Sequence, residues 1–413
     1  MMHLTGKERD WVLYDLGNSA FVMLTATVIP IYFKNIAEGA GMSAADSTAY
    51  FSYASSLVTV ISAVLGPVLG AVADIKGLKK PVFVCFMAVG VLGCVMLSIP
   101  AGWLLFLGIY VFAKTGYQGS LTFYDSMLTD VTTEDKVDQV SAHGYAWGYI
   151  GSCIPFIVSI VLILCAKPLG IENGQAVAAV FLLNAGWWFF MTVPLLKSFE
   201  QTCYVERREH LVRDSFVRLF KVLQEVWKNK RIFWFLAAFF FYIDGVYTII
   251  DMATSYGKDV GISDTDLMLA LLLTQVVAFP CSILFGNLAK KMESGRLIRY
   301  SILGYLGVVL FAVQMSHAWE FWFLAVCVAV FQGGIQALSR SYFTRIIPRE
   351  QAAEYFGFYD IFGKGAAFTG TLMLGAATQL SGTSRTGIGL LSVLFLAGYI
   401  LFRKAEKADG KCS

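Results

Sequence analysis

Long apolar runs dominate this chain, and each is about the length of a helix that crosses a lipid bilayer. A transmembrane helix needs about 20 predominantly apolar residues. The pattern predicts an all-α integral membrane protein with twelve such helices. Their approximate ranges are 11–35, 48–73, 81–100, 102–128, 140–165, 175–196, 232–256, 265–289, 297–316, 319–344, 353–380 and 386–402.

One long polar connection, residues 197–230, divides the predicted helices into two groups of six. Residues 1–196 are expected to form an N-terminal six-helix bundle, and residues 231–403 a C-terminal one. The later part of the connection places aromatic and apolar residues at helical spacing among basic ones, which predicts an amphipathic helix at the membrane surface. Residues 404–413 form a polar tail.

The two halves repeat one another at an offset of about 215 residues. Gly70 and Gly286 occupy matching places at the end of a predicted helix, and each precedes a basic turn. The segments YQG at Tyr117 and FQG at Phe331 match in the same way. Two similar bundles in one chain are typical of secondary transporters that are built from parallel repeats.

The distribution of lysine and arginine predicts the orientation, because cytoplasmic loops carry most of these residues. With the N-terminus inside, 25 of the 32 lie in cytoplasmic segments and 4 in external ones. Both termini are therefore expected in the cytoplasm, and the plasma membrane is the expected location.

Composition narrows the possible functions further. The chain is 57% hydrophobic and 15% charged, with a formal net charge of +3. Soluble domains carry about 25% charged residues, and no basic tract interleaved with aromatics indicates a nucleic-acid partner. The eight scattered cysteines predict neither a disulfide framework nor a metal site. No nucleophile or metal-ligand constellation predicts an enzyme, and no cofactor is expected.

Asp244 is the most informative residue of the sequence, because it lies near the middle of the seventh predicted helix. A carboxylate at that depth costs about 2.5 kcal/mol or more, so it is expected to face a polar cavity or a partner. A transport role, as a proton or substrate site, and a buried structural ion pair are both open. Asp251 follows seven residues later on nearly the same face and is expected in an outer vestibule.

The other polar residues within the predicted helices fall into two layers by depth. A middle layer is expected to line a substrate cavity, although its lysines could instead form permanent salt bridges. Its members are Asn18, Lys114, Gln118, Asp244, Gln332, Gln336 and Lys364. An inner layer is expected to form a cytoplasmic gate, although charges at helix ends also simply reach the interface. Its members are Asp15, Asp74, Asp125, Arg340 and Asp360. For Asp74, a solvated loop position and a cap on a neighbouring helix are further alternatives.

Several of these stretches resemble the major facilitator superfamily. The segment from Gly70 to Lys80, GAVADIKGLKK, is similar to its cytoplasmic motif. More narrowly, the chain resembles the unknown-major-facilitator branch, which includes the fungal vacuolar amino-acid effluxer associated with autophagy. The matching stretches are YDLGNSAF, GYAWGYIG, YIDGVYTI, GGIQALSRS and EYFGFYDIFGK. Members of the branch usually carry Trp-Ala where this chain has Leu16-Gly17.

The resemblance implies a major facilitator fold and alternating access, and many carriers of that superfamily are driven by protons. The leading hypothesis is a monomeric transporter in the lipid bilayer, an exporter of a small organic solute, with amino acids or short peptides favoured and Asp244 as the proton site. An exporter or flippase of lipid-like or drug-like molecules is the alternative that the many aromatic residues suggest. A sensor on a transporter fold is a third possibility.

Overall fold

The computed structural model describes residues 4–168, 170–206, 222–259, 261–381 and 383–408. Twelve helices of at least 18 residues lie in this part of the chain. Ten stretches are long and apolar enough to cross a membrane. The two long helices outside those stretches are α5 (Trp103–Ser126) and α14 (Ala352–Ser381), which carry the predicted Lys114, Asp125 and Asp360. The polar side chains of these two helices lower their mean hydropathy. The ten apolar stretches make the protein a multi-pass membrane protein.

Contacts between Cα atoms divide the chain into two compact units. Unit 1 comprises residues 1–132, 147–212 and 350–357, and unit 2 comprises residues 133–146, 213–349 and 358–413. Two helices, α7 (Val137–Ala166) and α14, therefore contribute residues to both units. The predicted bundles, 1–196 and 231–403, differ from these units in two short segments: residues 133–146 belong to unit 2, and residues 350–357 belong to unit 1. The predicted division remains a prediction.

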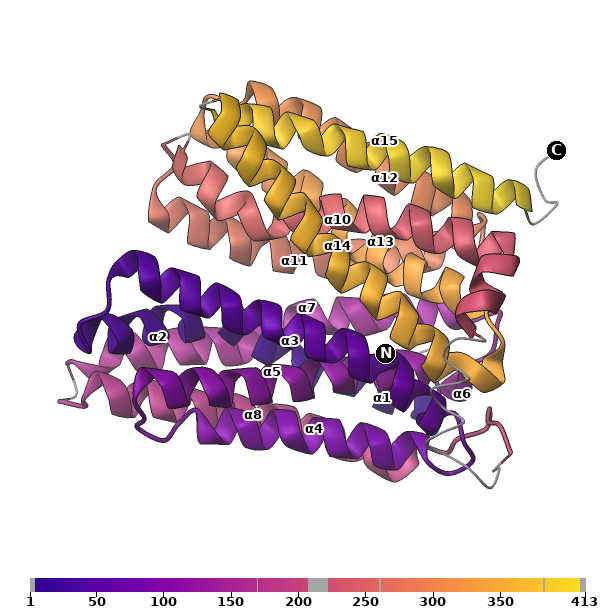
Figure 1. Cartoon of the computed structure of the whole chain (residues 1–413), viewed down its shortest axis with the longest axis horizontal. Coiled ribbons are helices and arrows are strands. Elements are labelled where there is room, and N and C mark those ends of the chain that lie inside the picture. The colour runs from indigo at the N-terminus through magenta and orange to yellow at the C-terminus, as the bar shows by residue number, and fades with distance from the viewer. Residues whose placement is uncertain (1–3, 169, 207–221, 260, 382, 409–413) are drawn as a thin grey trace. The chain divides into compact units, whose positions relative to one another are not determined.

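Apart from its share of α7 and α14, the described part of unit 1 contains seven helices, most of which are labelled in Figure 1. They are α1 (Gly6–Ala26), α2 (Val28–Gly39), α3 (Ala44–Ala73), α4 (Lys79–Met96), α5, the short α6 (Leu128–Val131) and α8 (Asn173–Ser198). Unit 2 contains α10 (Lys230–Asp259), α11 (Asp264–Leu288), α12 (Ser294–Gln314), α13 (Ala318–Ile346), the rest of α14 and α15 (Ser384–Ala408).

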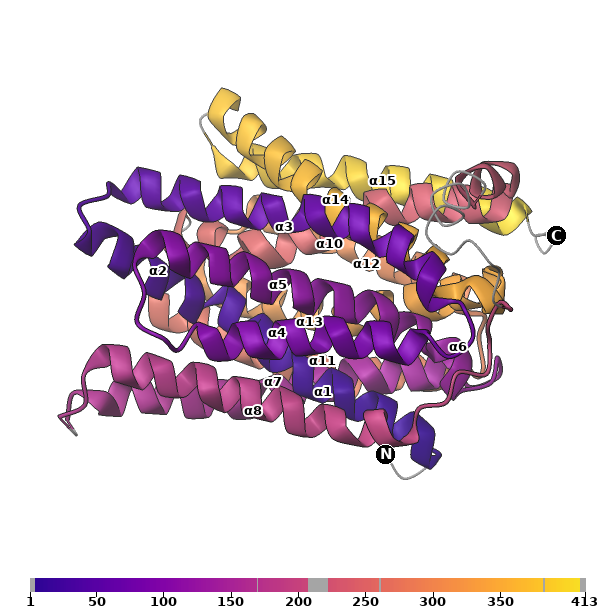
Figure 2. The same ribbon diagram turned by 60° about the horizontal axis from the view of Figure 1, so that its bottom comes forward.

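The helix pairings of unit 1 recur in unit 2, as the sequence repeat predicts. In unit 1, α1 packs on α8, α4 on α5, and α3 on α5. The corresponding pairs in unit 2 are α10 with α15, α12 with α13, and α11 with α13. Figures 1 and 2 show α4 and α5 side by side in unit 1 and α12 beside α15 in unit 2.

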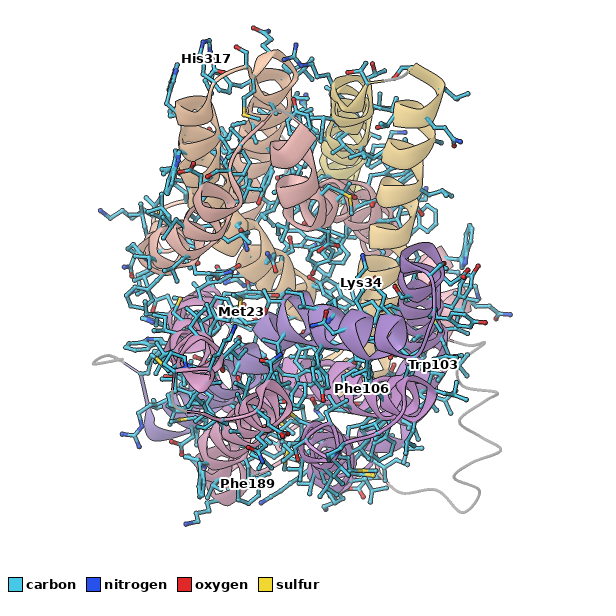
Figure 3. All side chains as sticks on the ribbon, turned by 90° about the vertical axis from the view of Figure 1, so that its left-hand side faces the viewer. Met23, Lys34, Trp103, Phe106, Phe189 and His317 are labelled. Carbon is cyan, nitrogen blue, oxygen red and sulfur yellow. The ribbon has the colours of Figure 1, made fainter. Side chains whose placement is uncertain are left out.

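The first predicted helix, 11–35, is two helices in the structure. Thr27 separates α1 from α2 with φ −130° and ψ −72°, outside the helical region. Pro30 has no backbone N–H, so it cannot donate to the carbonyl four residues earlier. Between ring centroids, Tyr32 of α2 lies 5.5 Å from Phe106 of α5, and Tyr50 of α3 lies 5.3 Å from Trp103 of α5. Phe106 and Trp103 are labelled in Figure 3.

The Leu16-Gly17 pair lies where α1 contacts α8 and α7 closely. A Cβ at Gly17 would lie 2.7 Å from the Cβ of Met191 and 3.3 Å from the Trp188 carbonyl oxygen of α8. Leu16 packs against Gly151 of α7, where a side chain would overlap it. The small residue in this chain therefore allows close contact between α1 and α8.

The amphipathic helix predicted in 197–230 falls partly on residues outside the described ranges. Residues 222–228 are helical. Val222 and Val226 are buried on one side, whereas Trp227 is 65% exposed. The amphipathic helix at the membrane surface stays a prediction.

Candidate functional site

Asp244 lies in the middle of α10 and is completely buried in unit 2. Its Oδ1 atom accepts a hydrogen bond of 2.8 Å from the Gly370 N–H of α14 and one of 3.3 Å from the Thr248 hydroxyl. Its Oδ2 atom is buried and has no hydrogen-bond partner among the described residues. A buried polar atom without a partner is costly, so this oxygen is a candidate site for a proton or another ligand.

Glycine at position 370 is what allows that hydrogen bond. A Cβ built at Gly370 would overlap both Asp244 Oδ1 and the Thr248 hydroxyl oxygen. The N–H is part of helix α14, yet it donates to a carboxylate on another helix. The absence of a side chain thus brings the backbone of α14 against the carboxylate of α10.

Stacked aromatic rings fix α10 on the N-terminal side of Asp244. The Phe239 ring stacks on Tyr359 of α14, with 4.1 Å between centroids. Tyr242 and Ser339 of α13 share a hydrogen bond of 2.7 Å. These contacts hold Asp244 in place without any charged partner among them.

Arg340, predicted as a gate residue, is 2% exposed in unit 2. Its guanidinium donates to the Ser141 hydroxyl at 2.9 Å and to the Ser141 carbonyl at 3.0 Å. The same group lies 4.4 Å from the centroid of the Tyr145 ring. Asp125, another predicted gate residue, is buried in unit 1, and the gate formed by the inner-layer charges stays a prediction.

Asp74 caps a helix, which is one of the alternatives that its sequence position left open. Its two oxygens accept hydrogen bonds of 2.9 Å from the N–H groups of Ala353 and Glu354, in the first turn of α14. Negative charge at a helix N-terminus is stabilised by the helix dipole. Gly70 makes room, since a Cβ there would lie 2.5 Å from the Ala353 carbonyl oxygen.

Asp138 was missed as a site residue from sequence. It lies in the first turn of α7, and Arg345 of α13 binds both its oxygens, at 2.6 and 3.0 Å. The hydroxyls of Ser294 and Ser341 also donate to it. In the sequence, Arg345 is one of the 25 basic residues that the predicted orientation places in the cytoplasm.

The repeat offset could have found this cluster. An offset of 215 relates Lys79 to Ser294 and Asp130 to Arg345. In unit 1, Lys79 and Asp130 form an ion pair of 2.8 Å whose side chains are both completely buried. The matching pair in unit 2 is neutral Ser294 with cationic Arg345, and Asp138 supplies the negative charge.

The predicted substrate residues of unit 1 lie along α1 and α5. Lys114 donates from Nζ to the Tyr110 hydroxyl at 2.9 Å, and that hydroxyl lies 3.0 Å from the Ser55 hydroxyl. Asn18 is buried and donates to the Tyr14 carbonyl at 3.1 Å. Gln118 is half-buried on α5, and Asp15 is buried on α1.

The remaining predicted residues lie in unit 2. Gln332 and Gln336 are buried on α13. Asp360 is half-buried and Asp251 is exposed. The side chain of Lys364 lies outside the part of the structure that is described.

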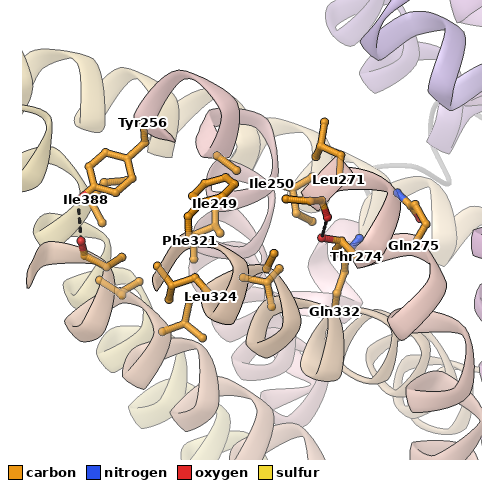
Figure 4. A pocket seen from close by; sticks show the side chains of 17 residues that line it. Ile249, Ile250, Tyr256, Leu271, Thr274, Gln275, Phe321, Leu324, Gln332 and Ile388 are labelled. Atoms are coloured by element: carbon orange, nitrogen blue, oxygen red, sulfur yellow. Dashed lines mark hydrogen bonds between the residues drawn. The ribbon is translucent and has the colours of Figure 1, made fainter. Parts of the chain in front are cut away.

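Unit 2 also contains a cavity of about 100 Å³ (Figure 4). Its walls come from α10, α11, α12, α13 and the first turn of α15. Gln332 lies in the wall, with Thr274 and Gln275 of α11 at the same end (Figure 4).

Comparison with known proteins places the chain in a family. The family model described as "Vacuole effluxer Atg22 like" matches residues 7–137 and 129–411. The chain belongs to the Atg22-like family of major facilitator transporters. Its family and fold are those of transporters and not of enzymes, and the resemblance seen in the sequence is confirmed.

Relatives and solved structures agree with this assignment. The chain is 44% identical to the MFS-type transporter YxiO of Bacillus subtilis, over 97% of this chain and 95% of the relative. It is 22% identical to autophagy-related protein 22 of Eremothecium gossypii, over 97% and 91%. Among solved structures, the transporter FucP superposes with a TM-score of 0.74 at 13% identity, covering 96% of this chain and 98% of FucP. That last likeness concerns the fold alone.

Proposed function

We propose that this Atg22-like protein is a proton-coupled secondary transporter that exports a small organic solute, with amino acids or short peptides favoured. Asp244 is the proton site. The observation that carries the proposal is the difference between its two oxygens, since Oδ1 accepts hydrogen bonds and Oδ2 accepts none from the described residues.

The geometry around Asp244 suits a group that gains and loses a proton. A proton would bind Oδ2, because that oxygen makes no other hydrogen bond among the described residues. The bonds from Gly370 and Thr248 to Oδ1 would stay in place. Burial disfavours a charge and hydrogen bonds favour it, so the balance changes if the surroundings change during transport.

The other predicted residues complete the proposal. Asn18, Lys114, Gln118, Gln336 and Lys364 contact the cargo. The inner-layer charges form the cytoplasmic gate, and Asp251 belongs to an outer vestibule. The charge distribution supports cytoplasmic termini, and a monomer in the plasma membrane is the working form. The description of the family model, "Vacuole effluxer Atg22 like", supports efflux of a solute from a compartment.

Reconstitution into proteoliposomes tests the assignment. Labelled amino acids and dipeptides are screened first for transport driven by a pH gradient. Asp244→Asn is then expected to abolish uptake driven by the pH gradient while retaining exchange of cargo across the membrane, because exchange needs no net proton movement. Glu172→Gln is the control and retains both, because this exposed carboxylate before α8 makes no side-chain hydrogen bond that caps the helix. Full gradient-driven uptake by Asp244→Asn would refute the proton assignment.

A second candidate is export of amphipathic, drug-like or lipid-like molecules. The cavity in unit 2 supports an apolar part of such a cargo, since isoleucine, leucine, valine and phenylalanine side chains form most of its wall. A fluorescent uncharged amphipathic compound and a labelled phospholipid, tested in the same vesicles, distinguish this cargo from amino acids.

A further inference from the structure

The cavity of unit 2 has an uncharged wall. Its lining includes Ile249 and Ile250 of α10, Val309 of α12, and Leu324 and Val328 of α13. No aspartate, glutamate, lysine or arginine is among the described residues that line it. A charged ligand would lose its hydration there without compensation, so an occupant must be uncharged.

Two polar groups of this wall are already satisfied. The Thr274 hydroxyl donates to the Ala270 carbonyl at 2.8 Å, and the Tyr256 hydroxyl donates to the Ala312 carbonyl at 2.6 Å (Figure 4). Gln332 differs from them. It is 5% exposed, and its Oε1 atom is buried without a hydrogen-bond partner among the described residues.

An unsatisfied amide oxygen in an apolar cavity requires an N–H or O–H donor. Leaving such an acceptor unpaired costs about 1–3 kcal/mol. The cavity is smaller than the roughly 150 Å³ that holds benzene in a well-studied engineered protein, so it fits one small ring or a short branched chain.

We propose that this cavity is a binding site for a small, uncharged, mostly apolar group that carries one hydrogen-bond donor, which it places against Gln332 Oε1. The group is either part of the cargo or a separate small molecule. The site does not depend on Asp244 or on proton coupling, and so it can stand if the proposed transport mechanism fails.

Pyrrole and furan are matched probes for this chemistry. Both are five-membered rings of nearly equal size, but only pyrrole has an N–H donor. Saturable binding to the purified full-length protein in lipid nanodiscs is measured by calorimetric titration. The thermal shift, which rises with ligand concentration by mass action, is a second readout. Pyrrole is expected to bind at least about fivefold more tightly than furan, since it satisfies the buried acceptor.

Three variants complete the experiment. Gln332→Leu keeps the approximate volume and removes the acceptor, so the preference for pyrrole disappears while furan still binds. Ala325→Phe fills the cavity, so both probes lose saturable binding. Gln314→Leu, at the exposed end of α12, is the control and behaves as the wild type. If Gln332→Leu fails to fold, Ala325→Phe and the pyrrole-to-furan ratio of the wild type decide the result.

The proposal is overturned if the wild type binds pyrrole and furan equally, if neither binds saturably, or if Gln332→Leu keeps the preference. Competition then separates the two sources of the ligand. Pyrrole that is displaced by the cargo found in the vesicle screen places part of the cargo in the cavity. Pyrrole that binds together with the cargo indicates a separate small molecule.

Discussion

The Asp244 carboxylate accepts a hydrogen bond from the backbone N–H of Gly370, across 2.8 Å and between two helices, α10 and α14. The donor is a backbone N–H, so a side chain at position 370 cannot supply this hydrogen bond. A side chain there would instead overlap the acceptor. Position 370 therefore offers a direct test of how much this contact matters.

Gly370→Ala is expected to push Asp244 and Thr248 away from α14, because the added Cβ would overlap their oxygens. Overpacking of this kind costs about 1–3 kcal/mol, and gradient-driven transport should fall at least about tenfold. Thermal unfolding and vesicle uptake measure the two effects.

Gly365→Ala is the matched control for that variant, since nothing lies within 4 Å of a Cβ at this position of the same helix. It should be neutral or gain up to about 1 kcal/mol from helix propensity. Equal losses in both variants would mean that α14 tolerates no substitution in this region and that the Asp244 contact is not special.

The Asp138–Arg345 pair should contribute measurably to stability. Arg345→Met leaves a carboxylate that is 5% exposed without its cation. Breaking a buried pair costs about 3–5 kcal/mol, and because Arg345 is 28% exposed we expect about 2–3 kcal/mol here. The double variant Asp138→Asn/Arg345→Met should lose less than the sum of the single changes. Strict additivity in this cycle would argue against the pair.

Asp74→Ala should free the N-terminus of α14, where its carboxylate caps Ala353 and Glu354. The loss of a cap costs about 0.5–2 kcal/mol. Hydrogen exchange should accelerate at the amides of Ala353 and Glu354 and stay unchanged in α8. Gly186→Ala, where a Cβ meets nothing within 4 Å, is a neutral control in α8. Unchanged exchange at both amides would show that the cap does not hold this helix end.

A surface pair should make a small contribution to acid stability. Lys7, which donates to Glu200 at 2.6 Å, lowers the pKa of that carboxyl below its ordinary value of about 4.5. A carboxyl group whose pKa is lowered by folding stabilises the folded protein at pH values above its ordinary pKa. This contribution is lost as the pH falls through the pKa that the group has in the folded protein. Lys7→Met should therefore flatten the acid side of the unfolding profile, whereas Lys7→Arg should preserve it. Identical profiles for all three proteins would contradict this linkage.

The hydrophobic pattern predicted the helices and the repeat well, because membrane-spanning length and composition are local properties. The pattern also drew attention to Asp244, since a carboxylate in the middle of a long apolar run can be recognised from the sequence alone. The break at Thr27 was missed, because Pro30 lies inside an otherwise continuous apolar run.

The partners of these residues could not be predicted in the same way. Asp138 and Arg345 are 207 residues apart, and each looks like an ordinary loop charge when read alone. The Gly370 contact depends on a backbone N–H, which carries no signature in the sequence. The sequence places Gln332 in the middle layer of polar residues, but its apolar surroundings and the lack of a hydrogen-bond partner for its Oε1 atom among the described residues are properties of the packing alone.

The cap on α14 has a consequence for how the protein is made. Asp74 and Ala353 are separated by 279 residues, so at roughly 5–20 residues per second the carboxylate is synthesised about 15–55 seconds before its donors. Until α14 has been inserted, Asp74 must stay hydrated or borrow another partner. Unit 1 is thus completed by one of the last helices to leave the ribosome. In a chain that stops before α14, the Asp74 carboxylate would lack the two backbone donors that it binds in the folded protein.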